Sequence, residues 1–182
     1  MFFRTPGECS ELARGFGWDE ASLGALQSLP ATEPGSLALS FEHSLADSFQ
    51  LAHAIAQQLP ELSECVLWVK EYGIWTALDN RHLYYRVRQS YGDRRSITDA
   101  PGHEFVKHEY VDLVMFLELT IRLGWGAVVF ASRPQAACFI SHDGWIKFSG
   151  LPDADETART LKESQFFTEM PAWTTPAAGG PH

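Results

Sequence analysis

Hydrophobic and polar residues follow their clearest pattern between the first linker and the middle of the chain. They alternate over 37–41, which is typical of a strand with one buried face. Apolar residues then recur at helical spacing over 45–59, with Ser44 as N-cap, and a nearly continuous apolar run covers 65–69. Strand, helix and strand in this order predict a βαβ unit, whose two strands are parallel and joined by a right-handed crossover.

Two helices are expected in the middle of the chain. The first begins at Asp79, with Leu83, Val87 and Tyr91 facing the core and the arginines pointing outward. The second covers 110–123 and is apolar on more than one side, so it should be covered by more than one neighbour.

The chain then changes to short strands. Apolar runs over 127–131 and 136–140 flank a turn and predict an antiparallel pair. Asp143 and Gly144 form a two-residue turn signal that favours a further hairpin, although Ser141 or Asp143 could instead cap a short helix.

These elements predict one α/β domain over 37–150, with α+β as the alternative. Its mixed sheet would combine the βαβ unit with a C-terminal antiparallel hairpin, and the helices would pack on the sheet. Residues 1–36 are expected to be an N-terminal extension with a short helix capped by Asp19. Residues 151–182 are expected to be a C-terminal extension with a short helix and a mobile tail.

The overall charge narrows the classes of partner. A formal net charge of -9 opposes general binding to nucleic acid or to anionic membranes. No apolar run reaches the roughly 20 residues that a membrane-spanning helix needs, so no membrane partner is expected. The cysteines are 3 in number and form no C-x-x-C, which favours buried thiols in a cytoplasmic protein over disulfides or a zinc site.

A cleft at the strand ends is the first candidate site. Ligands of open α/β sheets bind outside the carboxyl ends of parallel strands. The predicted strands deliver there carboxylates, an imidazole, aromatic rings and a guanidinium that suit a small polar molecule or a partner loop: Glu42, His43, Glu71, Tyr72, Trp75 and Arg133.

The arginine-rich helix within 81–95 is the second candidate. Tyr85, Arg86 and Arg88 are the residue types that hold phosphates or bases. A solvated helix face explains the same residues, and the acidic total makes an acidic protein partner a better match than nucleic acid.

Two histidines followed by carboxylates are the third candidate. His103 and His108 are five residues apart, so they do not share a helix face as a zinc-binding pair would. We therefore expect a polar loop here and no metal. Because the sequence also lacks a phosphate-binding loop, a dinucleotide fingerprint and a nucleophile elbow, we expect no cofactor.

Four short segments resemble stretches of bacterial proteins to which no function is assigned: Tyr72-Gly-Ile-Trp75, Asn80-Arg-His-Leu-Tyr-Tyr-Arg86, Gln89-Ser-Tyr-Gly-Asp93 and Ser141-His-Asp-Gly-Trp145. The resemblance implies a compact bacterial α/β domain and supplies neither an activity nor a site.

The sequence thus predicts a non-catalytic binding or protein-interaction module, such as an immunity-like or regulatory partner. The alternative is a small enzyme or ligand-binding domain, with Glu71 or His43 as acid or base and Arg133 or Arg88 holding an anion. A third hypothesis is contact with an anion or nucleic acid through the arginine-rich helix.

Overall fold

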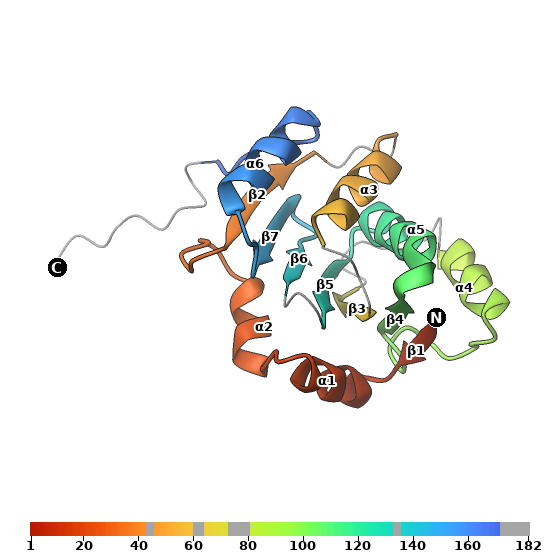
Figure 1. Ribbon diagram of the computed structural model, residues 1–182. Coiled ribbons are helices and arrows are strands. Elements are labelled where there is room, and N and C mark those ends of the chain that lie inside the picture. Colours follow the sequence, from red (N-terminus) through yellow and green to blue (C-terminus); the bar gives the residue numbers. More distant parts are fainter. Residues whose placement is uncertain (43–45, 60–63, 73–80, 133–135, 172–182) are drawn as a thin grey trace, which may run out of the picture.

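A single sheet between two layers of helices forms the protein. The computed structural model describes residues 1–42, 46–59, 64–72, 81–132 and 136–171. In Figure 1, α1 and α2 lie below the sheet, whereas α3, α5 and α6 lie above it and α4 lies beside α5.

The sheet has 8 strands in the order β1-β4-β3-β5-β6-β7-β2-β8. Every neighbouring pair is antiparallel. The strands are β1 Phe2–Arg4, β2 Leu37–Phe41, β3 Glu64–Glu71, β4 Gly102–Val106, β5 Gly126–Ala131, β6 Ala137–Ile140, β7 Trp145–Ser149 and β8 Phe167–Glu169.

The helices of the described residues are α1 Pro6–Gly15, α2 Glu20–Leu26, α3 Ser48–Gln58, α4 Arg81–Ser90, α5 Tyr110–Arg122 and α6 Ala154–Glu163, with a 3₁₀ turn η1 at Lys107–Glu109. Asp19 caps α2 as expected, since its side chain accepts a hydrogen bond from the backbone N–H of Ser22. The expected cap Ser44 lies outside the described residues, and α3 begins after Asp47.

The predicted mixed sheet with a parallel βαβ unit is wrong. Strands β2 and β3 do run in the same direction, but β5, β6 and β7 lie between them, and each pairs only with antiparallel neighbours. Alternation and apolar runs identify strands without identifying their neighbours, so a strand-helix-strand order does not by itself establish parallel pairing. The two predicted antiparallel hairpins are confirmed as β5-β6 and β6-β7.

The two faces of the sheet have separate cores. On the central strand β3, Cys65, Leu67 and Val69 pack in the larger cluster with α3 and α5. The alternate residues Val66 and Trp68 pack in the smaller cluster with α1 and α2. This division follows from the two-residue period of a strand, which sends successive side chains to opposite faces.

Residues 1–36, expected as an extension, contribute to both the sheet and its lower covering. Strand β1 pairs with β4 at one edge. A capping box begins α1: Thr5 accepts from the backbone N–H of Glu8, and the Glu8 carboxylate accepts from that of Thr5. The sequence holds this signal, Thr5 with Glu8 three residues later, before a segment that lacks a clear apolar period.

Helix α4 is turned relative to its predicted orientation. Leu83 and Tyr91, expected in the core, are 45% and 39% exposed, whereas Tyr84 and Arg88 are buried. The amphipathic pattern fails here because the helix buries a hydrogen-bonded tyrosine and arginine in place of aliphatic side chains. None of the helices in the described ranges is sufficiently long and apolar to span a membrane.

Candidate functional site

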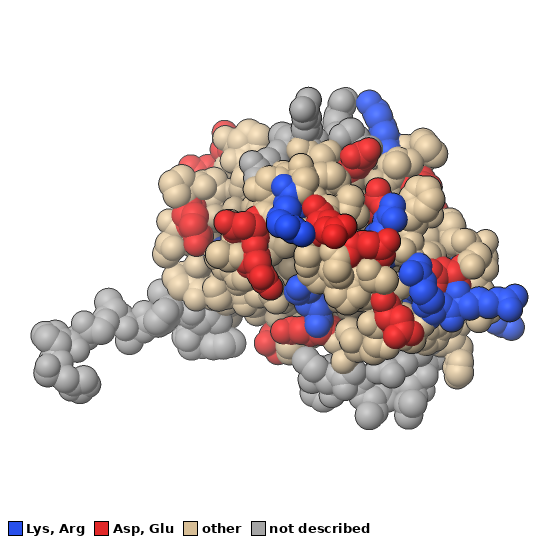
Figure 2. All heavy atoms as spheres, turned by 90° about the horizontal axis from the view of Figure 1, so that it is seen from below, with Lys and Arg blue, Asp and Glu red and all other residues tan. Residues whose placement is uncertain are grey.

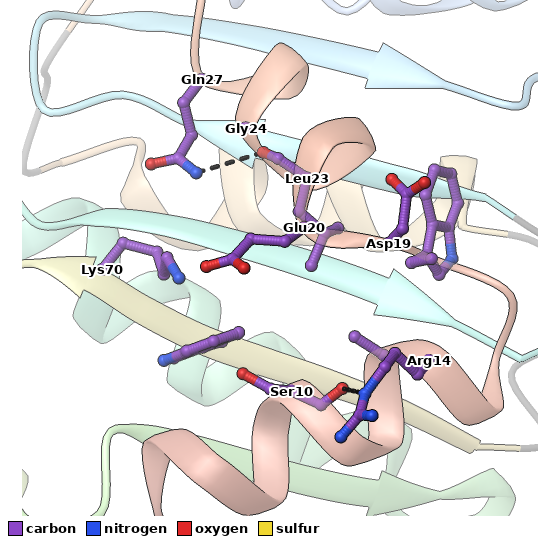
Figure 3. A pocket seen from close by; sticks show the side chains of 11 residues that line it. Ser10, Arg14, Asp19, Glu20, Leu23, Gly24, Gln27 and Lys70 are labelled. Atoms are coloured by element: carbon purple, nitrogen blue, oxygen red, sulfur yellow. Dashed lines mark hydrogen bonds between the residues drawn. The ribbon is translucent and has the colours of Figure 1, made fainter.

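A cavity lies on the lower face of the sheet, between α1, α2 and β3, and has a volume of about 330 Å³. Its apolar walls come from both helices and from the sheet: Ala13, Trp18, Leu23 and Trp68. Its polar lining includes Ser10, Arg14, Asp19, Glu20, Gln27 and Lys70. Figure 3 shows Ser10 and Arg14 coming from one helix, Glu20 and Gln27 from the other, and Lys70 from the strand between them. An apolar concavity with a few polar groups is the usual form of a small-molecule site.

An N-cap and a buried lysine position α2 over the sheet. Asp19 is the N-cap of the helix, and the side chains of Leu23 and Leu26 are buried on its inner side. At its other end, the Nζ of Lys147 donates to the carbonyl oxygens of Ala25, Ser28 and Pro30 at 3.0, 3.1 and 3.3 Å.

Lys147 comes from β7, and its side chain is only 2% exposed. A carboxylate oxygen of Glu33 lies 3.4 Å from its Nζ, so the buried charge has an ionic partner as well as the three carbonyls. This lysine therefore fixes the C-terminal end of α2, and with it one wall of the cavity.

Lys70 and Trp68 form the strand side of the cavity. The Nζ of Lys70 lies 3.3 Å from the centroid of a Trp68 ring, which is a close cation–π contact. Partial burial lowers the pKa of Lys70 because it disfavours the charged ammonium, and the nearby Glu20 opposes this effect.

Three polar groups of the cavity lack a partner among the described residues. In the part of the chain that the structure describes, the Lys70 ammonium, the Glu20 carboxylate and the Trp68 indole N–H make no hydrogen bond or ion pair. The Nε of Arg14 donates to the Ser10 carbonyl at 3.4 Å. The cavity thus offers both cationic donors and an anionic acceptor to a ligand.

The lower face carries charge of both signs. Figure 2 views the molecule from below and shows acidic and basic residues interspersed over this face, without a field of one sign. The clustered positive charge on which nucleic-acid binding depends is not visible on this face in Figure 2.

The residues predicted at strand ends are only partly described. His43, Trp75 and Arg133 lie outside the described residues. Glu42 and Tyr72 are exposed at the ends of β2 and β3, which three strands separate. The end of β5 lies at the opposite end of the strands from the ends of β2 and β3, because Ser132 N–H donates to the Glu64 carbonyl at the start of β3.

Glu71 meets a histidine that the sequence analysis did not place beside it. The Nδ1 of His142 lies 2.9 Å from Glu71 Oε2, and its Nε2 lies 3.3 Å from Asp143 Oδ1. The β6-β7 turn brings His142 to the end of β3, across the intervening β5. An imidazole between two carboxylates could transfer protons, but the described contacts bring no substrate-binding cavity to it.

The three residues predicted on the arginine-rich helix have different environments. Arg86 is exposed and Tyr85 is half-buried, with its hydroxyl accepting from Ile97 N–H at 3.4 Å. Arg88 is fully buried and donates to the Tyr84 hydroxyl at 2.8 Å, the Ala100 carbonyl at 2.9 Å and the Asp93 carboxylate at 3.0 Å.

The Nε of Arg88 has no hydrogen-bond partner among the residues that the structure describes, and the guanidinium lies over the Phe3 ring, 4.3 Å from the centroid. Arg88 thus joins α4 to the following loop and to β1, and its burial leaves it unable to meet a nucleic acid.

His103 continues this buried network from β4. Its Nε2 lies 2.9 Å from the Tyr84 hydroxyl, and its Nδ1 lies 3.2 Å from the Leu67 carbonyl oxygen. Burial, reinforced by the positive charge of Arg88, lowers the pKa of His103 to about 3, so the ring is neutral. The predicted polar loop is therefore a strand at this residue, and the described residues contain no group of three potential metal ligands.

The cavity was not predicted from the sequence. Its strand side has a readable signal, since Trp68 and Lys70 are two residues apart and so share one face of β3. Its helical side has almost none, because residues 1–36 show no long apolar period that would assign them to the sheet's second face.

No family model, curated protein or solved structure matches this chain.

Proposed function

We propose that this protein is a non-catalytic binding module that holds a small, partly apolar molecule in the cavity between α1, α2 and β3. The single observation that supports the proposal is the combination of tryptophan walls with polar side chains that lack protein partners. Glu20 and Arg14 are exposed and Lys70 is half-buried, so a ligand that covers them would exchange their contacts with water for contacts of its own.

The chemistry of the lining favours binding over catalysis. The hydroxyl of Ser10 donates to the Pro6 carbonyl of its own helix at 3.1 Å, and no general base is in contact with it. The carboxylate of Asp19 is occupied in capping α2, and hydrogen bonds from the side chain and the backbone N–H of Ser22 lower its pKa. The lining can therefore orient a ligand by charge and stacking without an activated nucleophile.

A regulatory role follows naturally from this proposal. Occupation of the cavity would stabilise α1 and α2, which form an outer surface that a protein partner could recognise. The three cysteines are buried free thiols, which supports the cytoplasmic location expected from the sequence.

Gly24 allows a direct test. It lines the cavity, and a Cβ added to it would meet no atom within 4 Å. Gly24→Phe should place a ring in this open space and compete with a ligand, whereas Gly24→Ala adds only a methyl group. A library of small aromatic and aliphatic molecules would be screened by thermal shift, and each binder titrated by calorimetry against both variants.

Binders that Gly24→Ala retains and Gly24→Phe loses would support the proposal. Binders with the same affinity for both variants, or a library without any binder of the wild-type protein, would contradict it. Circular dichroism of both variants establishes that each is folded.

A further inference from the structure

The charged groups of the cavity are arranged as a pair on opposite elements. Lys70 projects from β3 and Glu20 from the first turn of α2, and Figure 3 shows the Glu20 carboxylate directed toward the Lys70 side of the cavity. No ion pair within 4.0 Å joins them in the described residues, although Glu20 influences Lys70 electrostatically. The two opposite charges thus line the same cavity without an ion pair between them among the described residues.

The remaining charges of the lining give the same balance. Arg14 adds a second positive group and Asp19 a second negative one. A simple anion would meet Lys70 and Arg14 but would be repelled by both carboxylates. A simple cation would be attracted by Glu20 and Asp19 but repelled by both positive groups. A molecule with one charge of each sign, close together, satisfies both sides.

The walls define the rest of such a molecule. Trp18 is 6% exposed and Trp68 is 9% exposed, and Leu23 and Ala13 complete an apolar surface. Tryptophan faces and edges pack well against another aromatic ring. The volume of about 330 Å³ is at the lower end of the range for small-molecule sites, which limits the ligand to a compact body.

From this juxtaposition we infer that the cavity binds a small zwitterion with an apolar or aromatic body, of the α-amino acid class. The ligand's carboxylate lies toward Lys70 and its ammonium toward Glu20, while its side chain packs against Trp68 and Trp18. The inference rests on the proposed binding function and specifies its ligand class.

Three probes separate the contributions of the two ligand charges. L-phenylalanine carries both charges, phenethylamine lacks the carboxylate and 3-phenylpropionate lacks the ammonium. Isothermal titration calorimetry of the wild-type protein should give the tightest binding for L-phenylalanine, with each analogue weaker by about tenfold or more, because each loses one charge-assisted contact.

Two isosteric variants test which protein group meets which charge. In Lys70→Met, the advantage of L-phenylalanine over phenethylamine should shrink, since only Arg14 remains to meet the carboxylate. In Glu20→Gln, the advantage of L-phenylalanine over 3-phenylpropionate should shrink, since only Asp19 remains to meet the ammonium. Lys162→Met and Glu163→Gln, on α6 above the sheet, are the matched controls and should preserve the wild-type order.

Equal binding of all three probes to the wild-type protein, or failure of L-phenylalanine to bind, would overturn the inference. So would a uniform loss for all probes in Lys70→Met or Glu20→Gln. If another molecule then binds and Gly24→Phe blocks it, the proposed function survives without this ligand class. If no molecule binds in a manner sensitive to Gly24→Phe, both fail.

Discussion

The upper and lower faces of the sheet bury their side chains in different ways. Above, α3 and α5 pack on one another and on the sheet, and their core contains aliphatic and aromatic residues. Below, the short helices α1 and α2 cover a smaller cluster and leave a cavity between them. The difference shows that the larger core lies above the sheet, whereas the open space that the proposed ligand would occupy lies below it.

Each face also holds one buried cation with its own kind of partner. Arg88, above the sheet, donates to the Tyr84 hydroxyl on its own helix. It also donates to the Asp93 carboxylate and the Ala100 carbonyl in the loop between α4 and β4. Lys147, below, bonds to three backbone carbonyls at the end of α2. Arg88 therefore stabilises the global fold, whereas Lys147 stabilises one wall of the cavity.

Removal of Arg88 should have the largest effect. Arg88→Met leaves the Tyr84 hydroxyl, the Ala100 carbonyl and one side of Asp93 without their partner, so we expect a loss of about 3–5 kcal/mol in the free energy of unfolding. Urea denaturation measures it. Arg86→Met, on the exposed side of the same helix, should change stability by less than about 0.5 kcal/mol. Equal losses would show that the buried network does not stabilise the upper face.

Removal of Lys147 should cost about 2–3 kcal/mol, because Lys147→Met leaves three carbonyl oxygens without their donor. Hydrogen exchange should quicken first in α2 and leave α5 protected, since the change is confined to the lower face. Lys162→Met serves as the control. Uniform quickening in both helices would contradict the separation of the two faces.

The stability of the upper face should depend on pH through His103. In the unfolded chain His103 takes up a proton near the ordinary histidine pKa of 6.5, whereas in the folded chain its pKa is lowered to about 3. Stability is therefore present above pH 6.5 and is lost as the pH falls below it, by about 2 kcal/mol between pH 7 and pH 5.

Denaturation of the wild-type protein and of His103→Gln over this pH range measures the contribution, and the variant should lose less stability than the wild-type protein. His82→Gln removes an exposed histidine and is the control. Parallel curves for wild type and His103→Gln would show that His103 titrates alike in both states.

The smallest expected effect is a gain. Gly24→Ala should stabilise the protein by about 0.5–1 kcal/mol, because alanine restricts the unfolded chain and meets no clash within α2. Thermal denaturation measures the shift. Gly92→Ala is the opposite case, since Gly92 has φ +83 and an alanine there is strained. A destabilised Gly24→Ala would mean that the cavity is less open than its geometry indicates.

The sequence predicted the helices and strands better than it predicted which strands pair with one another. Strong periods identified β2, α5 and the β5-β6-β7 hairpins, because local turn chemistry determines which strands of a hairpin pair. The long-range neighbours of β2 could not be predicted, since no local signal in 37–41 indicates pairing with strands near the far end of the chain.

The candidate site was harder to predict for two physical reasons. Strand-end residues such as Glu71 were placed by a rule for parallel sheets, which an antiparallel sheet does not obey. The cavity depends on α1 and α2, whose burial comes from tertiary contacts of Trp18 and Leu23 and not from a long amphipathic period. Only the Trp68 and Lys70 pair could have been recognised from spacing alone.

The strand order has a consequence for how the chain folds. Strand β2 is made early, yet both of its partners, β7 and β8, come from the last part of the described chain. Until β7 and β8 are synthesised, the backbone amides and carbonyls of β2 lack the strands with which they pair. Such high contact order slows folding and leaves an apolar strand open to misassociation on the ribosome. We therefore expect β2 to pair with β7 and β8 last, after both of these strands have been synthesised.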